Sequence, residues 1–343
     1  MENKVMYHYL ECNGVELFTM VFLPEENGQF PTVIYRTPYA NGAVKKSVEE
    51  VCEKKHEEFQ FWLDAGYAVV FQHCRGRGKS SGDFVPFIYE REDGLFLQDW
   101  VRKQSFYNGE IYLVGSSYLA AVHYVTAPFA DGIKGAVLEV MDCERYNLIY
   151  HNEFYKMGFH GRWYVRNYKQ NSGLTKSYTP DAYKTLPLTN ITETLFGERA
   201  EDFEEILRHP NKNDAFWNTK IGGPESHDAI KHANIPILLT TGFYDLFSSG
   251  TFTMWNGLDE DTKAKCALAV YPFGHNKTAE GQPINFENGE PAIAFEKYIL
   301  HWIDSVRGKC ASGSIFALAR SLFVLPFQYG YAFFKSSFVF SLM

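Results

Sequence analysis

Six short runs of apolar residues recur along the chain, at residues 31–35, 67–72, 111–114, 135–140, 235–240 and 267–271. Each run is continuous rather than alternating, a pattern typical of strands that are covered on both faces. Helical patterns lie between the runs, for example at residues 47–65 and 89–102. This alternation of strands and helices predicts an α/β domain with a mostly parallel sheet.

The stretch from residue 143 to residue 231 interrupts this alternation. It is rich in aromatic and charged residues, has helical patterns at residues 146–156 and 200–208, and contains no convincing buried strand. We interpret it as a helical cap inserted between two strands of the sheet. The predicted organisation is a core formed by residues 1–141 and 233–308, a cap at residues 142–232 and an atypical tail at residues 309–343.

The tail differs from the rest of the chain in composition. Residues 310–343 contain no acidic residue, only two charged residues, Arg320 and Lys335, and seven phenylalanines. The charge-free run at residues 321–334 includes Pro326 and is shorter than the ~20 residues that a membrane span needs. We therefore expect no membrane span. We expect instead a truncated or frameshifted end that is poorly ordered or lies on the surface.

Charge and cysteine content narrow the function classes further. The net charge is −8, from 33 Lys and Arg against 41 Asp and Glu, so we expect no nucleic-acid partner. The six cysteines are scattered without a CxxC spacing, which weighs against a structural zinc site and fits a reducing compartment. The first eight residues contain no continuous apolar run, so we expect no signal peptide and a cytoplasmic enzyme.

A candidate nucleophile follows the third predicted strand, in the sequence GSSYLA at residues 115–120. A serine between a strand and a helix, with small residues nearby, is typical of a nucleophile elbow, although the strict G-x-S-x-G pattern is incomplete here. The elbow is so tight that its flanking side chains must be small. For Ser117 the flanks are Gly115 and, further on, Ala120, whereas for Ser116 they would be bulkier residues. The spacing favours Ser117; an ordinary turn with a capping serine is the alternative.

A serine hydroxyl becomes a nucleophile only when a base takes its proton and an acid orients that base. In this fold class the acid and then the histidine follow the serine along the chain. Two acids, Asp142 and Asp245, follow predicted strands, and the spacing alone leaves both open. His275 follows the last strand, whereas His301 falls in a late helical segment. The carboxyl ends of strands are where open α/β sheets build their sites.

A tetrahedral intermediate also needs hydrogen-bond donors for its oxyanion. The backbone N–H of Tyr118, directly after the candidate nucleophile, is one candidate. The phenol of Tyr39, held after Pro38 at the end of the first predicted strand, is the other.

Several motifs occur in one order between residues 30 and 308. They are R-T-P-Y at 36–39, R-G-R-G-K-S-S-G at 75–82, G-S-S-Y at 115–118, His209-Pro210 with Asp214 and Trp217, G-F-Y-D at 242–245 and G-H at 274–275. Together they resemble the CocE/NonD acyl esterases, the group of serine hydrolases that includes cocaine esterases and X-Pro dipeptidyl-peptidases of the S15 type.

The resemblance implies an α/β-hydrolase fold with a mostly parallel sheet and an inserted helical cap. It implies Ser117 as nucleophile, His275 as base, Asp245 rather than Asp142 as acid, and Tyr39 in the oxyanion hole. No metal or organic cofactor is expected. Four aromatic residues of the cap are candidates for an apolar substrate pocket, although they fit a cap core equally well: Phe154, Tyr155, Phe159 and Trp163.

The chain departs from the family pattern at three places. Ala120 replaces the usual glycine of the elbow. His73-Cys74 stands where the family has an aspartate before its R-G, so a structural carboxylate is expected to be missing. The family continues after the helical segment near Trp302 into a β-sandwich domain, where this chain has the Phe-rich tail.

The expected function is hydrolysis of acyl esters through an acyl-enzyme on Ser117. Cleavage of X-Pro dipeptides or other amides is the alternative, since the family hosts both reactions. The expected substrate is thus a small ester or a short peptide. A non-catalytic binding module on the same scaffold is the competing function class.

Overall fold

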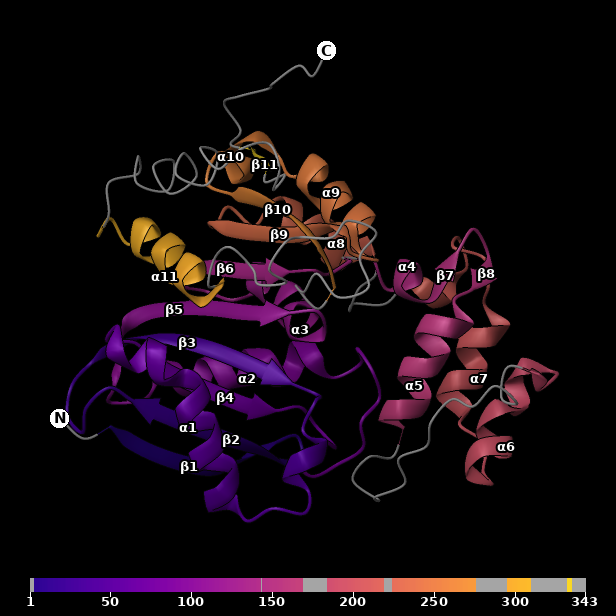
Figure 1. Ribbon diagram of the computed structural model, residues 1–343, viewed down its shortest axis with the longest axis horizontal. Helices are drawn as coiled ribbons and strands as arrows, with labels where there is room; N and C mark the ends of the chain where they lie inside the picture. The colour runs from indigo at the N-terminus through magenta and orange to yellow at the C-terminus, as the bar shows by residue number, and fades with distance from the viewer. Residues whose placement is uncertain are drawn as a thin grey trace, which may run out of the picture.

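The computed structural model describes residues 3–142, 144–168, 184–218, 224–275, 295–309 and 332–334. Its centre is a nine-stranded sheet of order β1-β2-β4-β3-β5-β6-β9-β10-β11 (Figure 1). The strands are β1 (Lys4–Cys12), β2 (Val15–Leu23), β3 (Phe30–Thr37), β4 (Ala68–His73), β5 (Tyr107–Ser116), β6 (Ile133–Glu139), β9 (Ile237–Tyr244), β10 (Ala267–Gly274) and β11 (Ala332–Phe334).

The sheet is mostly parallel, as the sequence predicts. All six predicted strands are present, as β3, β4, β5, β6, β9 and β10, and each pairs in parallel with its neighbours in that set. Strands β1 and β2, which were not predicted, form an antiparallel hairpin that pairs with β4 through β2. The hairpin turn is Asn13-Gly14, and both residues have positive φ, as a two-residue type I′ turn requires.

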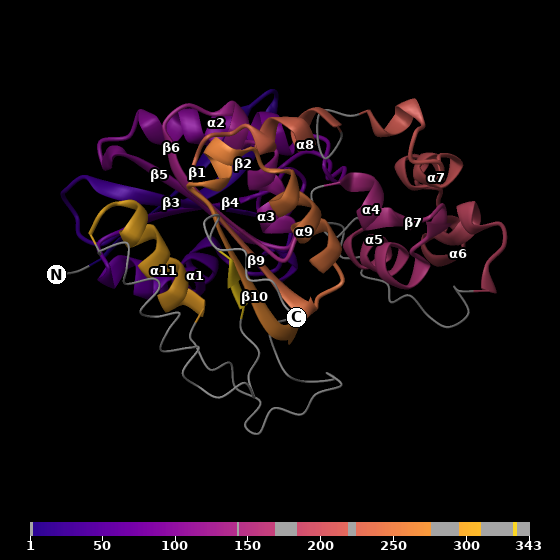
Figure 2. The ribbon, with the colours of Figure 1, turned by 90° about the horizontal axis from the view of Figure 1, so that it is seen from above.

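Helices cover both faces of the sheet (Figure 2). Helices α1 (Val48–Asp64) and α11 (Phe295–Val306) pack on one face. Helices α2 (Glu90–Arg102), α3 (Tyr118–Tyr124), α8 (Pro224–Lys231) and α9 (Ser248–Gly257) pack on the other face, and the short helix α10 (Glu260–Lys263) precedes β10. Successive side chains of a strand enter opposite layers, Val33 with α1 and Ile34 with α2. This two-sided burial explains why the strand sequences are continuous apolar runs.

The first predicted helix shows how local sequence sets an element's start. Ser47 precedes α1, and its hydroxyl accepts a hydrogen bond from the Glu50 backbone N–H, while the Glu50 carboxylate accepts one from the Ser47 N–H. This reciprocal capping box satisfies two amide donors that the first helical turn leaves without partners. The buried face of the helix carries Phe59 and Trp62 against the sheet.

Between β6 and β9 the chain leaves the sheet and forms a group of short elements. They are α4 (Arg145–Ile149), β7 (Tyr150–His151), β8 (Phe154–Tyr155), a π-helical turn (Met157–Gly161), α5 (Arg162–Asn167), 3₁₀ turns at Leu188–Asn190 and Ala215–Trp217, α6 (Ile191–Phe196) and α7 (Glu201–Arg208). Figure 1 shows this group beside the sheet, on the side toward which the arrows of β3 and β5 point. It has a small apolar cluster of its own, which includes the fully buried Phe203.

One expectation for this region needs correction. The helix predicted at residues 146–156 ends at Ile149, because the chain turns into the β7–β8 hairpin. Asn152 and Glu153, the two turn residues, both have positive φ, which no helix can accommodate. Helix α8 falls in the predicted cap range but packs on the core. It contacts α9, and Arg91 of α2 donates a hydrogen bond to the Ser226 hydroxyl of α8. The helix predicted at residues 200–208 is confirmed as α7.

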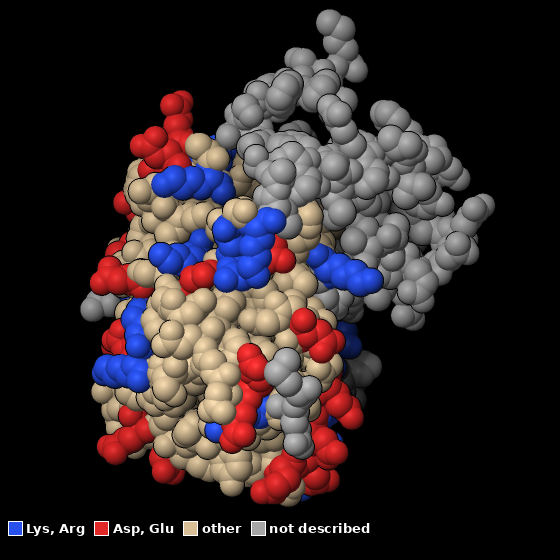
Figure 3. All heavy atoms as spheres, turned by 90° about the vertical axis from the view of Figure 1, so that its left-hand side faces the viewer, with Lys and Arg blue, Asp and Glu red and all other residues tan. Residues whose placement is uncertain are grey.

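Only a small part of the C-terminal tail is described. Ala332–Phe334 form β11, which pairs antiparallel with Leu268–Val270 of β10 at the edge of the sheet. The other tail residues lie outside the described residues, so the expected character of the tail stays a prediction. Among the helices that the structure describes, none is long and apolar enough to cross a bilayer. On the face seen in Figure 3, basic side chains lie close to acidic ones in several places.

Candidate active site

Ser117 stands in the sharp turn between β5 and α3. Its backbone has φ 57° and ψ −124°, and its N–H is bonded to the Glu139 carbonyl oxygen of β6. A Cβ on Gly115 would lie 2.1 Å from the Leu119 carbonyl oxygen, so no larger residue fits there. Ala120 is fully buried in the same turn. The close approach of strand and helix, from which the sequence analysis chose Ser117, is therefore present, and an alanine suffices at position 120.

Three predicted residues meet at the carboxyl ends of β5, β9 and β10. The Ser117 Oγ lies 2.9 Å from His275 Nε2, and His275 Nδ1 lies 2.7 Å from Asp245 Oδ2. The other Asp245 oxygen accepts a hydrogen bond from the Phe247 backbone N–H at 2.6 Å. A neutral His275 with its proton on Nδ1 can donate to Asp245 and accept from the serine hydroxyl. This is the arrangement that activates a serine nucleophile.

The alternative acid, Asp142, has a different environment. Its carboxylate accepts a hydrogen bond from the Glu144 backbone N–H at 2.9 Å. It also packs so closely on Gly250 of α9 that a Cβ there would lie 2.2 Å from a carboxylate oxygen. The carboxylate that accepts the hydrogen bond from His275 Nδ1 is that of Asp245, the acid that the family resemblance selects. His301 lies on α11, which covers a face of the sheet.

The two candidate oxyanion donors flank Ser117. Tyr118 begins α3, so its backbone N–H is one of the helix's free amino-terminal donors. The Tyr39 hydroxyl accepts a hydrogen bond from Trp163 Nε1 at 3.2 Å. Burial of this hydroxyl raises the pKa of Tyr39, while hydrogen bonds with Trp163 and Ser117 act in the opposite direction. Although 45% of the Tyr39 residue is exposed, its hydroxyl thus lies near the candidate nucleophile, and its raised pKa keeps it protonated.

A buried polar network anchors the Tyr118 side chain away from Ser117. The Tyr118 hydroxyl donates to a Glu90 carboxylate oxygen at 2.8 Å and accepts from the Phe87 N–H at 2.9 Å. Glu90 also pairs with Arg36, whose side chain is 1% exposed, at 3.1 Å. Arg36 starts the R-T-P-Y motif that ends in Tyr39. The network therefore ties both candidate donor segments to helix α2.

Of the four aromatic residues predicted to line a substrate pocket, two contact residues next to the candidate triad. The Trp163 ring stacks on Tyr118 with a centroid distance of 5.8 Å, and the Phe159 ring meets Phe247 edge-on at 5.3 Å. Phe247, which the sequence analysis missed, in turn packs edge-on against the His275 ring. Trp163 and Phe159 therefore lie close to the candidate triad.

The other two aromatic residues are further removed. The Tyr155 hydroxyl is hydrogen-bonded to His160 Nδ1, and its ring meets Phe203 in the small apolar cluster. Phe154 is 80% exposed on the β7–β8 hairpin. A pocket-lining role for Phe154 therefore has no support from its position.

His73 fills the place where the family pattern has an aspartate. Its Nδ1 accepts a hydrogen bond from the Lys79 N–H, and the Ser80 hydroxyl donates to its carbonyl oxygen. Burial and two nearby lysines lower the pKa of His73 to about 3, so the ring is neutral and can accept. The loop that carries Arg75 and Arg77 is thus held by an imidazole instead of a carboxylate.

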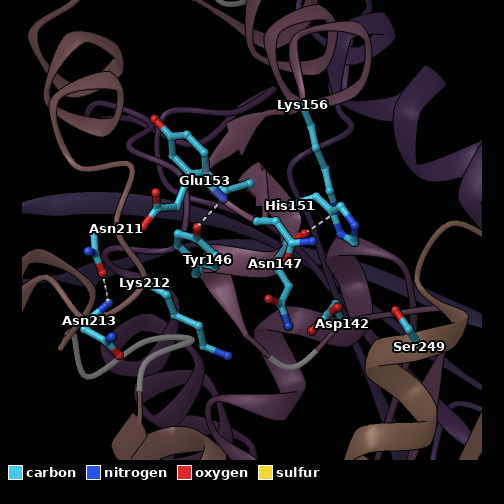
Figure 4. Close-up of a pocket in the computed structure, with 12 residues that line it drawn as sticks. Asp142, Tyr146, Asn147, His151, Glu153, Lys156, Asn211, Lys212, Asn213 and Ser249 are labelled. Carbon is cyan, nitrogen blue, oxygen red and sulfur yellow. Dashed lines mark hydrogen bonds between the residues drawn. The ribbon is translucent and has the colours of Figure 1, made fainter.

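A cavity of about 420 Å³ lies between α4, the β7–β8 hairpin, the segment at residues 211–213 and the start of α9 (Figure 4). Its lining is mostly polar and includes the carboxylate of Asp142 and the hydroxyl of Ser249. Lys156, directly after β8, also lines the cavity, and its ammonium group donates to the Asn147 carbonyl oxygen. Burial raises the pKa of Asp142 to about 6.

Replacement of Asp142 by asparagine is expected to stabilise the fold at neutral pH. A carboxyl group whose pKa is raised on folding costs stability once the pH exceeds its unfolded value, near 4, and the full cost is reached above about 6. Above pH 7 the free energy of unfolding of Asp142→Asn should therefore exceed that of the wild type by on the order of 1–3 kcal/mol. The two values should converge near pH 4, and thermal melts across this pH range measure the difference. Asp228→Asn, at a side chain that is 74% exposed, is the matched control and should show no such trend. A pH-independent difference for Asp142→Asn would contradict the burial argument.

Metal ligands are not grouped in the part of the chain that the structure describes. There, no set of three or more His, Cys, Asp and Glu side chains is arranged to hold a metal ion.

The sequence matches known proteins over most of its length. Residues 13–277 match the X-Pro dipeptidyl-peptidase (S15 family). The chain is 23% identical over 291 residues to the cocaine esterase of Rhodococcus sp. (strain MB1 Bresler), an alignment that covers 77% of this chain and 47% of that protein. The chain thus spans about half the length of the curated relative that it matches.

Two solved structures have the same fold. An aminopeptidase from the marine sediment archaeon Thaumarchaeota archaeon superposes with a TM-score of 0.66 at 16% identity, over 88% of this chain and 55% of that one. An α-amino acid ester hydrolase superposes with a TM-score of 0.65 at 18% identity, over 89% of this chain and 54% of that one. The sheet order and the parallel strands are those of an α/β-hydrolase fold. By the match over residues 13–277, the chain belongs to the X-Pro dipeptidyl-peptidase family, S15.

Proposed function

We propose that this chain is a serine hydrolase that cleaves acyl esters by acyl transfer to Ser117 and then to water. The observation that carries the proposal is the continuous hydrogen-bonded relay from Ser117 through His275 to Asp245. Each link has the length of a hydrogen bond, and Asp245 is buried and held by a backbone N–H. A serine that only caps a helix or lies on the surface requires neither a histidine nor a buried carboxylate beside it.

The proposed chemistry follows from the positions of these atoms. Ser117 Oγ attacks the ester carbonyl carbon while its proton passes to His275 Nε2. Asp245 stabilises the imidazolium and keeps the ring in place. The tetrahedral intermediate is stabilised by the Tyr118 N–H and the Tyr39 hydroxyl, and it collapses as His275 returns the proton to the leaving alcohol. Water repeats the sequence on the acyl-enzyme and releases the acid.

Ester hydrolysis is our first choice of substrate class, and cleavage of X-Pro dipeptides or other amides is the second. The cocaine esterase and the α-amino acid ester hydrolase are both named for ester substrates. The aminopeptidase and the family description name peptides instead. We place the substrate's apolar part against Phe159 and Trp163, the two cap aromatics nearest the relay. We retain residues 142–232 as the proposed cap range, with α8 packed on the core.

The proposed cellular location is the cytoplasm. Cys12, Cys52, Cys74 and Cys266 are all buried free thiols, which suits a reducing compartment.

A fluorophosphonate probe tests the proposed activity directly. Only an activated serine attacks the phosphorus, so the chain should be labelled at Ser117, and Ser117→Ala should not be labelled. Turnover of short acyl esters compared with X-Pro amides then decides the substrate class. Absence of both labelling and turnover would favour a non-catalytic binding module.

A further inference from the structure

The turn that carries Tyr39 is held by a buried arginine that also holds the cap. Arg77 lies in the R-G-R-G loop and is 1% exposed. Its Nε donates to the Pro38 carbonyl oxygen at 2.7 Å, directly before Tyr39. Its Nη1 donates to the Asn167 carbonyl oxygen at 2.7 Å, and its Nη2 donates to Asn167 Oδ1 at 3.1 Å. One rigid guanidinium thus joins the core turn to the end of cap helix α5.

The same cap helix reaches back to Tyr39 through Trp163. Asn167 Nδ2 donates to the Trp163 carbonyl oxygen at 2.7 Å, and Trp163 Nε1 donates to the Tyr39 hydroxyl at 3.2 Å. A closed circuit therefore runs from Arg77 to Asn167, Trp163, Tyr39 and back through Pro38. The Trp163 ring also stacks on Tyr118 with an interplanar angle of 12°. Trp163 therefore touches both residues that supply the proposed oxyanion donors.

The direction of the hydrogen bond between Trp163 and Tyr39 determines what the Tyr39 hydroxyl can do. A phenol oxygen has one proton to donate and can accept through its lone pairs. Since an indole N–H can only donate, Trp163 engages a lone pair of Tyr39 and leaves the phenol proton for another acceptor. Burial raises the pKa of Tyr39 overall, while donation from Trp163 and the positive charge of Arg77 act in the opposite direction.

We propose that Arg77 and Trp163 form a clasp that positions the Tyr39 hydroxyl toward the oxyanion and so makes completion of the oxyanion hole depend on docking of the cap helix α5. The proposal rests on the proposed function. Arg77 and Trp163 act as positioning residues through Tyr39, and Trp163 contributes its N–H to this role separately from any contact of its ring with substrate. The sequence singled out Arg77 only as part of a motif and gave no sign that it bridges core and cap.

Trp163→Phe tests the clasp because it removes the N–H and keeps an aromatic ring against Tyr118. Loss of one neutral hydrogen bond to a transition-state donor should lower kcat about threefold to tenfold, with KM nearly unchanged. The matched control is Trp217→Phe, which removes an indole N–H that donates to the His209 carbonyl oxygen elsewhere in the cap. That control should leave kcat at the wild-type value.

A double-mutant cycle with Tyr39→Phe separates positioning from a general structural effect. If Trp163 acts through the Tyr39 hydroxyl, Trp163→Phe should cause no further loss of kcat once that hydroxyl is gone. An equal loss of kcat in both backgrounds would overturn the clasp, as would a Trp163→Phe variant with wild-type kcat. Wild-type protein without fluorophosphonate labelling or turnover would overturn the proposed function and the clasp together, so the two failures are distinguishable.

A second pair of variants tests the bridging arginine. Arg77→Lys keeps the charge but cannot span Pro38 and Asn167 with a rigid fork, and Arg77→Met removes both charge and donors. We expect kcat to fall in the order wild type, Lys, Met, and the loss to shrink in the Tyr39→Phe background. Melting curves identify any variant that fails to fold, in which case Trp163→Phe alone decides. A folded Arg77→Met variant with wild-type kcat would overturn the part assigned to Arg77.

Discussion

Replacement of Ser117 by alanine should lower kcat for ester hydrolysis by about 10⁴-fold or more, because the three relay residues act as a unit and the nucleophile has no substitute. Ser117 Oγ is the atom within hydrogen-bond distance of His275 Nε2. The alanine side chain fits the elbow, so the fold and the binding of substrate should persist. Steady-state turnover of a short acyl ester measures the loss, and a circular dichroism spectrum checks the fold.

Ser116→Ala is the internal control for this experiment. Ser116 is the last residue of β5 and the direct neighbour of Ser117. The hydroxyl bonded to His275 Nε2 is that of Ser117, not that of Ser116. Most of the activity should therefore remain. The reverse outcome, an active Ser117→Ala variant and an inactive Ser116→Ala variant, would show that the register inferred from Gly115 and Ala120 is wrong.

The second large effect is expected at Tyr39. Removal of its hydroxyl in Tyr39→Phe should lower kcat by ~10²–10³-fold and change KM little, because the donor acts on charge that develops only in the transition state. The phenyl ring retains the edge-on contact with Tyr118, so the change isolates the hydroxyl. Comparison of kcat and KM for one ester substrate measures the effect.

Tyr9→Phe is the matched control for Tyr39→Phe. Tyr9 lies on β1 and has nearly the same exposure, 43% against 45%. Its loss of a hydroxyl should not change turnover. If Tyr39→Phe has a normal kcat, Tyr39 is only a turn residue, and the second oxyanion donor must be another group.

The sequence predicted the six central parallel strands and missed the antiparallel hairpin of β1 and β2, although residues 17–23 of β2 are buried on both faces. The six central strands each give a continuous apolar run, which is visible without knowledge of their neighbours. Strand β1 alternates buried and exposed residues, so it produced no such run. The Asn13-Gly14 turn was the signal that could have located the hairpin, since this dipeptide between two strand-forming segments favours a type I′ turn.

Some residues of the candidate site could be predicted from the local sequence, whereas others are brought there only by tertiary packing. Ser117 and His275 follow strands, so their common edge could be predicted from order alone. The choice between Asp142 and Asp245 could not, because both follow strands and only the family resemblance separated them. The bridge from Arg77 to Asn167 spans 90 positions of sequence and joins core to cap. No local pattern encodes such a contact, and the same is true of the packing of Phe247 on His275.

The residues of the relay follow strands at different depths in the sheet, and this difference bears on how the enzyme loses activity on heating. Ser117 follows β5, which has parallel partners on both sides, whereas His275 follows β10. Among the described residues, the outer edge of β10 is paired only by the three residues of β11. Local opening of a fold starts where the fewest bonds hold a strand. Amide hydrogens of β10 should therefore exchange with deuterated water sooner than those of β5, and a warmed sample should lose turnover reversibly while its helices and central strands remain folded.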